Sequence, residues 1–346
     1  MMSTLKRNHL LLMLILLILL QASALTGQDL HRYEFESRHM GTTFQIILFA
    51  ENDSIADLAS ESAFSRIEEI NDILSDYMPD SELSRLSKRS GSGEQVTVSK
   101  PLFDFLERSV EISKETDGWF DITIGPYTHI WRGLNRMSEP TLPDVEELAN
   151  ARSRVGFDML SLDAANQTAS LEKEGMRLDP GGIGKGFASD TALLSLREAG
   201  ITRALINAGG DISAGDPPPG RDGWTIAVPV RFDADSTLHE ELIISNRAVN
   251  TSGSLYQSVD IDDVTYSHII NPRTGLGHTE QVQVTAISAN GAVADAFATA
   301  LSVMPVSKAQ HVVENRPDLE AVIYWLDENG QSVRWASKEF ELLSKP

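Results

Sequence analysis

The stretch from Leu178 to Asp190 constrains this chain more than any other, because four glycines lie within six of its residues. It reads Leu-Asp-Pro-Gly-Gly-Ile-Gly-Lys-Gly-Phe-Ala-Ser-Asp and leads into a helical pattern from Ala188. Glycine has no Cβ, so backbone can approach a ligand closely, and N–H groups at a helix start attract anions. Together with the charge of Lys185, the pattern predicts a phosphate or pyrophosphate site. A tight turn that only feeds the helix is the alternative.

The common nucleotide-binding loops do not fit this stretch. A Walker A loop would need Gly where Asp179 stands and Ser or Thr where Gly186 stands. Neither Gly182 nor Gly184 starts a complete G-x-G-x-x-G motif. Other segments must therefore decide between a ligand site and a turn.

Composition limits the partners. The chain has 346 residues, of which 41% are hydrophobic and 23% charged, as in an ordinary globular protein with a sizeable core. Its net charge of -21 repels nucleic acid over most of the surface, so we expect no nucleic-acid partner. An anionic small ligand would need a local site with basic residues or a divalent metal.

Residues 1–24 have the pattern of a secretory signal. Lys6 and Arg7 precede an apolar run from Leu10 to Leu20, and Ala22-Ser23-Ala24 supplies small residues for a signal peptidase. An uncleaved anchor is the alternative. The chain has no cysteine, which excludes disulfides, thiolate catalysis, thiolate metal sites and the lipid-attachment cysteine of a bacterial lipoprotein.

Periodicity predicts a single α+β domain over residues 25–346, without internal repeats. Helices are expected at 55–77, 100–116, 144–152, 188–199 and 292–304. Strands are expected as a pair within 33–49, as a hairpin within 159–171, and at 203–206, 224–230, 238–244, 282–289, 321–325, 333–336 and 340–343. Residues 127–143 are expected to be irregular.

A carboxylate and a hydroxyl share one face of the last long helix. Asp295 and Thr299 are four residues apart within small and apolar residues, so both side chains are expected to stack on one side of a buried helix. A buried carboxylate needs a partner, and Mg²⁺ suits a carboxylate, a hydroxyl and the backbone carbonyls of a glycine loop. The alternative is that Asp295 caps or hydrogen-bonds a neighbouring turn.

His268 lies in a dense polar motif with Asn271 and Arg273. It is either a general acid or base or a strand residue satisfied by the adjoining turn. The chain has no G-x-S-x-G elbow and no H-E-x-x-H motif, so a serine hydrolase or a zinc peptidase has little support.

Eight segments, taken in order, resemble the ApbE family, the FAD:protein FMN transferases. They are Met40-Gly41-Thr42, Tyr77 with Pro79 to Leu83, Gly118 to Pro126, Asp179 to Asp190, Asn207 to Ile212, Thr251-Ser252-Gly253, Ser267 to Gly275 and Ala294 to Leu301. The resemblance covers nearly all of the chain after residue 24. It implies a single ApbE-like domain, related to the T-fold, of mixed and mainly antiparallel sheet with packed helices.

The resemblance also implies an activity. Such an enzyme uses Mg²⁺ to cleave FAD at its pyrophosphate, attaches FMN through a phosphoester bond to a Thr or Ser of a target flavoprotein, and releases AMP. The acceptor would be a subunit of a sodium-pumping or Rnf-type redox complex, or another exported flavoprotein. Without a lipid-attachment cysteine, the protein would be periplasmic, or held at the inner membrane by an uncleaved signal.

The resemblance assigns site residues position by position. Asp295, Thr299 and the backbone carbonyl of Gly182 match metal ligands. His268 falls in a His-Ile-Asp-Pro-x-Thr-Gly motif, in which Asn271 replaces the usual Asp, and receives a proton-transfer or positioning role; with Asp295 it forms the expected catalytic pair. The positions that match FAD contacts are Met40, Tyr77, Trp119, Phe120, Asp121, Asp179, Lys185 and Ile269.

Two other functions remain open from the sequence. With water as the acceptor, the same site would make the protein an FAD pyrophosphatase that yields FMN and AMP. Without turnover, it would be an FAD-binding protein. A pure binding protein would not need the metal ligands, and both Asp295 and Thr299 are present.

Overall fold

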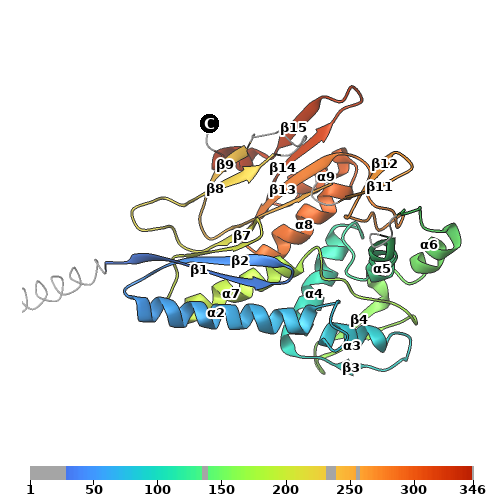
Figure 1. The fold of residues 1–346 in the computed structure, drawn as a ribbon, viewed down its shortest axis with the longest axis horizontal. Helices are drawn as coiled ribbons and strands as arrows, with labels where there is room; N and C mark the ends of the chain where they lie inside the picture. Colours follow the sequence, from blue (N-terminus) through green and yellow to red (C-terminus); the bar gives the residue numbers. More distant parts are fainter. Residues whose placement is uncertain (1–28, 135–138, 231–238, 255–257, 345–346) are drawn as a thin grey trace, which may run out of the picture.

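The computed structural model describes residues 29–134, 139–230, 239–254 and 258–344, so the expected signal at residues 1–24 lies outside it. Its centre is an eight-stranded sheet in which all neighbouring strands run antiparallel (Figure 1). Across the sheet the strands are β1 (His31–His39), β2 (Thr42–Ala50), β6 (Ala204–Ala208), β7 (Asp211–Ala214), β10 (Ala248–Gly253), β13 (Val282–Ser288), β14 (Leu319–Leu326) and β15 (Ser332–Ala336).

Three helices cover one face of this sheet: α2 (Asp53–Leu74), α7 (Gly184–Glu198) and α8 (Gly291–Val303). Alternation along β2 places Phe44, Ile46 and Leu48 fully buried on the helical side. The opposite face packs against the hairpin of β8 (Trp224–Pro229) and β9 (His239–Ile244) and against α10 (Lys338–Leu343). The sheet therefore has a core on both faces, and the expected ligand loop belongs to the helical one.

The remaining elements lie mostly beside the helical layer, at the right of Figure 1. They are α3 (Glu82–Lys88), β3 (Val96–Thr97), α4 (Lys100–Glu115), α5 (Gly125–Leu134), α6 (Val145–Arg152), β4 (Leu160–Asp163), β5 (Thr168–Leu171), β11 (Ser258–Ile261), β12 (Val264–Ser267) and α9 (Val306–Glu314). Strands β3, β5 and β4 form a small sheet of their own. The α+β class with a mainly antiparallel sheet is confirmed.

Two sequence predictions are wrong. Residues 127–143 include most of α5, whose Tyr127, Trp131 and Leu134 are buried at helical spacing although glycine and polar residues interrupt the pattern. Residues 340–343 were expected to form a strand and instead lie in α10, where Phe340 is fully buried and Leu342 is 72% exposed. With so few residues, an apolar run does not distinguish a strand from a helix.

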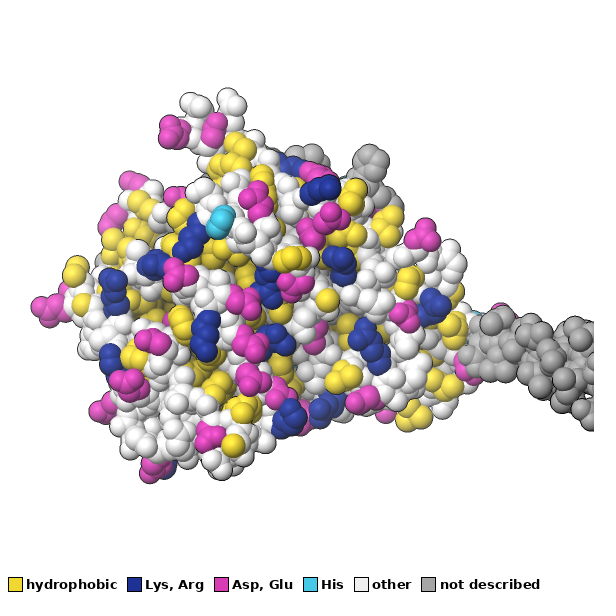
Figure 2. Space-filling model, turned by 180° about the vertical axis from the view of Figure 1, so that it is seen from behind, with side chains coloured by type: hydrophobic (Ala, Val, Ile, Leu, Met, Phe, Trp, Pro, Cys, Tyr) yellow, Lys and Arg dark blue, Asp and Glu magenta, His cyan; other side chains and the backbone are white. Residues whose placement is uncertain are grey.

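The surface agrees with the mixed composition. On the face shown in Figure 2, acidic and basic side chains lie side by side, with hydrophobic side chains between them. Within the described residues, no helix is long and apolar enough to cross a membrane.

Candidate active site

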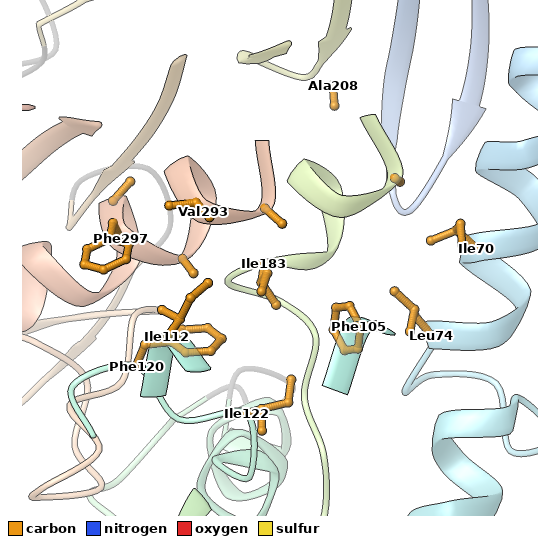
Figure 3. Packing of buried hydrophobic residues seen from close by; sticks show 14 of the residues in the cluster. Ile70, Leu74, Phe105, Ile112, Phe120, Ile122, Ile183, Ala208, Val293 and Phe297 are labelled. Carbon is orange, nitrogen blue, oxygen red and sulfur yellow. The ribbon is translucent and has the colours of Figure 1, made fainter. Parts of the chain in front are cut away.

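The glycine-rich loop is fixed to the core where α7 begins. Ile183, directly before this helix, is fully buried and lies in the centre of the packed side chains in Figure 3. Glycine at 186 is required, because a Cβ there would come within 2.2 Å of the carbonyl oxygen of Gly291 at the start of α8. The two helices therefore begin in direct backbone contact.

Each of these two helices carries a carboxylate that accepts hydrogen bonds from backbone N–H groups at the start of the other helix. Asp190 of α7 accepts hydrogen bonds from the N–H groups of Gly291 at 2.7 Å and Ala292 at 3.0 Å. In return, Asp295 of α8 accepts one from the N–H of Gly186 at 3.0 Å. Amides in the first turn of a helix lack intrahelical partners, so each carboxylate stabilises the start of the other helix.

Asp295 lies in a charged cluster although it is only 4% exposed. Burial and the nearby Asp211 raise the pKa of Asp295 to about 7, while Lys185 acts in the opposite direction. Lys185 forms an ion pair with Asp211, and this carboxylate together with Asp295 raises the pKa of Lys185 despite its burial. Two acids thus share one lysine, and a further cation would relieve the excess negative charge.

Asp211 reaches this cluster because of a tight turn between β6 and β7. Gly209 and Gly210 adopt φ values of +67° and +107° there, which side chains rarely tolerate. In the sequence, Asn207 to Ile212 stands out only as one of the segments that resemble the family, and no role falls to Asp211. An acid directly after two glycines at a strand end was the available signal.

The three expected metal ligands come together. Thr299 lies one turn after Asp295 on α8, and a Cβ at Gly182 would be 3.1 Å from the Thr299 hydroxyl oxygen, so the loop backbone lies directly against that hydroxyl. Ser252 of β10 contacts the same hydroxyl, with an oxygen–oxygen distance of 3.3 Å. A carboxylate, a hydroxyl and a carbonyl are hard oxygen donors, so the residues present fit Mg²⁺.

This donor set relies on only one acid. Within the described residues, no group of three or more His, Asp or Glu side chains is arranged to hold a metal ion. The assignment of Gly182, Asp295 and Thr299 to a metal therefore stays a prediction, supported by their convergence and by the charge of the cluster.

A second cluster lies at the loop's other end. Asp179 accepts from the N–H of Gly181 at 2.8 Å and from Arg132 of α5 at 2.9 Å. Arg132 also pairs with Asp76, and its guanidinium carbon lies 4.3 Å from the centre of the Tyr77 ring. The structure thus joins two of the expected FAD contacts, Asp179 and Tyr77, through an arginine that sequence reasoning missed.

In the aromatic segment before α5, most side chains are buried or bonded within the protein. Phe120 is buried in the core (Figure 3), and Trp119 is covered by Arg273, whose guanidinium carbon lies 4.5 Å from the ring centre. Both oxygens of Asp121 accept hydrogen bonds inside the protein, from Thr123 and from the N–H of Phe157 at 3.0 Å. A ligand contact at Asp121 would have to share these oxygens or use the backbone.

The other expected site residues lie on turns. Met40 occupies the β1–β2 turn with a φ of +49°, which is uncommon for a side-chain-bearing residue. His268 follows β12 and is exposed, whereas the next residue, Ile269, is buried and donates its N–H to Ser267 at 3.1 Å. The FAD contacts expected at Met40 and Ile269, and the proton-transfer or positioning role of His268, stay predictions.

The fold and the site together define a class of protein: a single α+β domain whose glycine-rich helix start, lysine and oxygen donors are suited to a metal-bound anionic ligand. The chain belongs to the ApbE family, whose family model matches residues 40–323.

Similar proteins cover almost the same length. A FAD:protein FMN transferase of Vibrio cholerae serotype O1 is 31% identical over 281 residues, which cover 80% of this chain and 82% of the relative. Another, from Klebsiella pneumoniae strain 342, is 27% identical over 311 residues, which cover 88% and 87%. A solved flavin transferase ApbE from Vibrio cholerae has a TM-score of 0.81 at 27% identity, covering 91% of this chain and 100% of the other. The ApbE protein of Thermotoga maritima has a TM-score of 0.81 at 25% identity, with the same coverage.

Proposed function

We propose that this protein is an FAD:protein FMN transferase that depends on Mg²⁺. It would cleave the pyrophosphate of FAD, join FMN to a Thr or Ser hydroxyl of an acceptor flavoprotein, and release AMP. The observation that carries this proposal is the convergence of Lys185, Asp295, Thr299 and the Gly182 backbone at one helix start. The relatives named FAD:protein FMN transferase support the choice of substrate.

The residues of the chain have separate tasks in this reaction. Lys185 and the positive end of the α7 dipole attract the pyrophosphate, which offsets the repulsion expected from a net charge of -21. Asp295, Thr299 and the Gly182 carbonyl would hold Mg²⁺. When bound, Mg²⁺ neutralises charge on the pyrophosphate and polarises the phosphorus under attack.

The transfer itself exchanges one phosphorus–oxygen bond for another. The acceptor hydroxyl oxygen bonds to the FMN phosphorus, the bond from that phosphorus to the bridging oxygen breaks, and AMP leaves with the bonding electrons. The hydroxyl proton must go to a base, and His268 is our candidate because it is exposed and an imidazole ring can accept a proton.

The decisive experiment follows both products. Purified protein is incubated with FAD and Mg²⁺, with and without a threonine-bearing flavoprotein acceptor, while AMP release and acceptor mass are measured. AMP release together with an FMN-sized gain in acceptor mass is the expected result. AMP with free FMN and no mass gain would identify a pyrophosphatase instead, and intact bound FAD in both reactions would identify a binding protein.

We further propose that the protein is exported and acts at the periplasmic side of the inner membrane, on a subunit of a sodium-pumping or Rnf-type redox complex or on another exported flavoprotein. The signal pattern of residues 1–24 supports export. Cell fractionation with mass analysis of the mature N-terminus tests it: cytoplasmic protein that begins at Met1 would contradict it.

A further inference from the structure

One guanidinium joins three segments that are distant in the chain. Arg132 of α5 donates from Nη2 to Asp179 at the glycine loop, at 2.9 Å, and from Nη1 to Asp76, which follows α2. Its guanidinium carbon also lies 4.3 Å from the centre of the Tyr77 ring. Arg132 is therefore the shared contact of two residues that match FAD-binding positions.

The charges in this cluster depend on one another. The side chains of Asp76 and Asp179 are only 14% and 5% exposed, so both carboxylates need a compensating cation. Burial and the neighbouring Asp179 raise the pKa of Asp76, while Arg132 lowers it. Burial disfavours the charged form of Arg132, but Asp179 and Asp76 outweigh it and raise the pKa of this arginine. Without the guanidinium, two buried acids would face each other.

Tyr77 depends on the same contact for its orientation. This side chain is 72% exposed, so burial does not fix its ring. Arg132 covers one face of the ring, and the high exposure leaves the tyrosine available to a planar ligand. An exposed side chain loses rotamer freedom when a ligand orders it, so a ring held in advance binds at a lower entropic cost.

A cavity adjoins the cluster. Its volume is about 650 Å³, and Asp76, Tyr77, Arg132 and Leu178 are among the residues that line it. Cavities of this size typically hold ligands as large as a fused ring system. Tyr77 and Arg132 thus form part of the wall of this cavity, whose lining reaches Leu178, the residue directly before Asp179.

From these contacts we propose that Arg132 is a positioning residue for the dinucleotide: it holds Tyr77 as a stacking surface and fixes the orientation of the Asp179 carboxylate before the ligand arrives. This inference rests on the proposed function, because the ligand is FAD. Arg132 acts through its neighbours, so its loss should affect binding far more than the chemical step.

The test compares FAD affinity with turnover. R132M keeps an unbranched, flexible side chain but removes the charge and the planar fork. We expect the dissociation constant of FAD, measured by fluorescence polarisation, and KM to rise about tenfold in R132M, with kcat at saturating FAD changing less than twofold. R132K should fall between R132M and wild type, because an ammonium lacks the planar fork that reaches two carboxylates. R66M is the matched control, because Arg66 pairs with Glu69 on the outer side of α2, and its FAD affinity should stay unchanged.

A double-mutant cycle with Y77A separates positioning from a general effect. If Arg132 acts through Tyr77, R132M should weaken FAD binding less in the Y77A background than in wild type. D76N, which removes one anchor of Arg132, should weaken FAD binding in the same direction, and it provides a second test if R132M fails to fold. Unchanged FAD affinity in folded R132M and D76N, or additive effects of R132M and Y77A on FAD binding, would overturn this inference. The proposed function would still stand in that case, provided that wild type binds FAD. Wild type that binds no FAD would overturn both.

Discussion

Asp190 of α7 and Asp295 of α8 lie where these two helices touch, and each side chain reaches toward the other helix. Asp190 receives two backbone N–H groups from the first turn of α8, one on each oxygen. Asp295 receives one, from Gly186, and otherwise faces the charges of Lys185 and Asp211. Two carboxylates in one helix pair therefore have different surroundings.

The difference separates a structural acid, Asp190, from Asp295, for which we propose a metal-binding role. Burial raises the pKa of both, to about 6 for Asp190 and about 7 for Asp295. Backbone amides are the main compensation for Asp190, so its carboxyl group serves the fold as a hydrogen-bond acceptor at the start of α8. Asp295 has a second acid nearby and lies one turn from Thr299, so its charge is available to a cation. Substitutions at the two positions should therefore have opposite consequences.

The largest effect is expected from D295N. Transfer of FMN should fall by about a hundredfold or more, because loss of the carboxylate that we propose as a metal ligand would forfeit several kcal/mol of transition-state stabilisation. Asparagine can still accept from the Gly186 N–H, so the fold should remain. Mg²⁺ should raise the melting temperature of wild type but not of D295N, because only wild type would gain stability from bound metal. Normal turnover in D295N would remove the metal assignment.

A smaller effect, on stability instead of chemistry, is expected from D190A. Two amides at the start of α8 would lose their acceptor, which should lower the free energy of unfolding by about 2–3 kcal/mol. Urea denaturation measures this, and turnover at low temperature should remain near that of wild type. N52A is the matched control, because Asn52 caps α2 at the surface through one bond to the Ile55 N–H and should cost about 1 kcal/mol. If D190A abolishes turnover in a folded protein, the contrast between the two acids fails.

These two acids also show how far the sequence predicts the site. The spacing of Asp295 and Thr299 and the glycine loop were visible, because each depends on neighbours within one turn or one loop. The partner of Asp190 was not visible, because its bonds reach residues about a hundred positions away. The same is true of Arg132, whose two carboxylates come from other segments and which lies in a helix that the sequence hid behind glycine and polar residues.

The fold shows the same division. The predicted helices with a sustained apolar stripe, such as α2 and α4, appear close to their expected bounds. Strand β10 gave no strand signal, because Asn250, Thr251 and Ser252 are polar, yet it lies in the middle of the sheet. For Ser252 we ascribe the polar residue to the proposed site, because its hydroxyl lies 3.3 Å from that of Thr299.

A pH dependence of stability should distinguish Asp190 further. Its pKa is raised from 3.8 to about 6 in the folded protein, so the folded state binds this proton more tightly than the unfolded state does. The resulting stabilisation is complete below about pH 4 and is lost as pH rises through about 6. Relative to D190N, the free energy of unfolding of wild type should fall by about 1–2 kcal/mol between pH 4 and pH 7, after allowance for the partial exposure of Asp190. Urea midpoints at four pH values measure it, and a constant difference between the two proteins would contradict the raised pKa.

The smallest effect concerns the residue behind the predicted metal ligand. S252A removes the hydroxyl that lies 3.3 Å from the Thr299 oxygen and should weaken Mg²⁺ binding two- to fivefold, because outer contacts orient a ligand without binding the metal. T251V is the control: Thr251 is the adjacent residue of β10, faces the other side of the sheet and contacts Thr285 at 2.9 Å. Both substitutions lose one hydroxyl contact, so their stabilities should change alike, by less than about 1 kcal/mol. Mg²⁺ binding is titrated with the melting temperature as the readout, and only S252A should shift this titration. An equal shift in T251V would mean that sheet stability, and not the orientation of Thr299, sets the metal affinity.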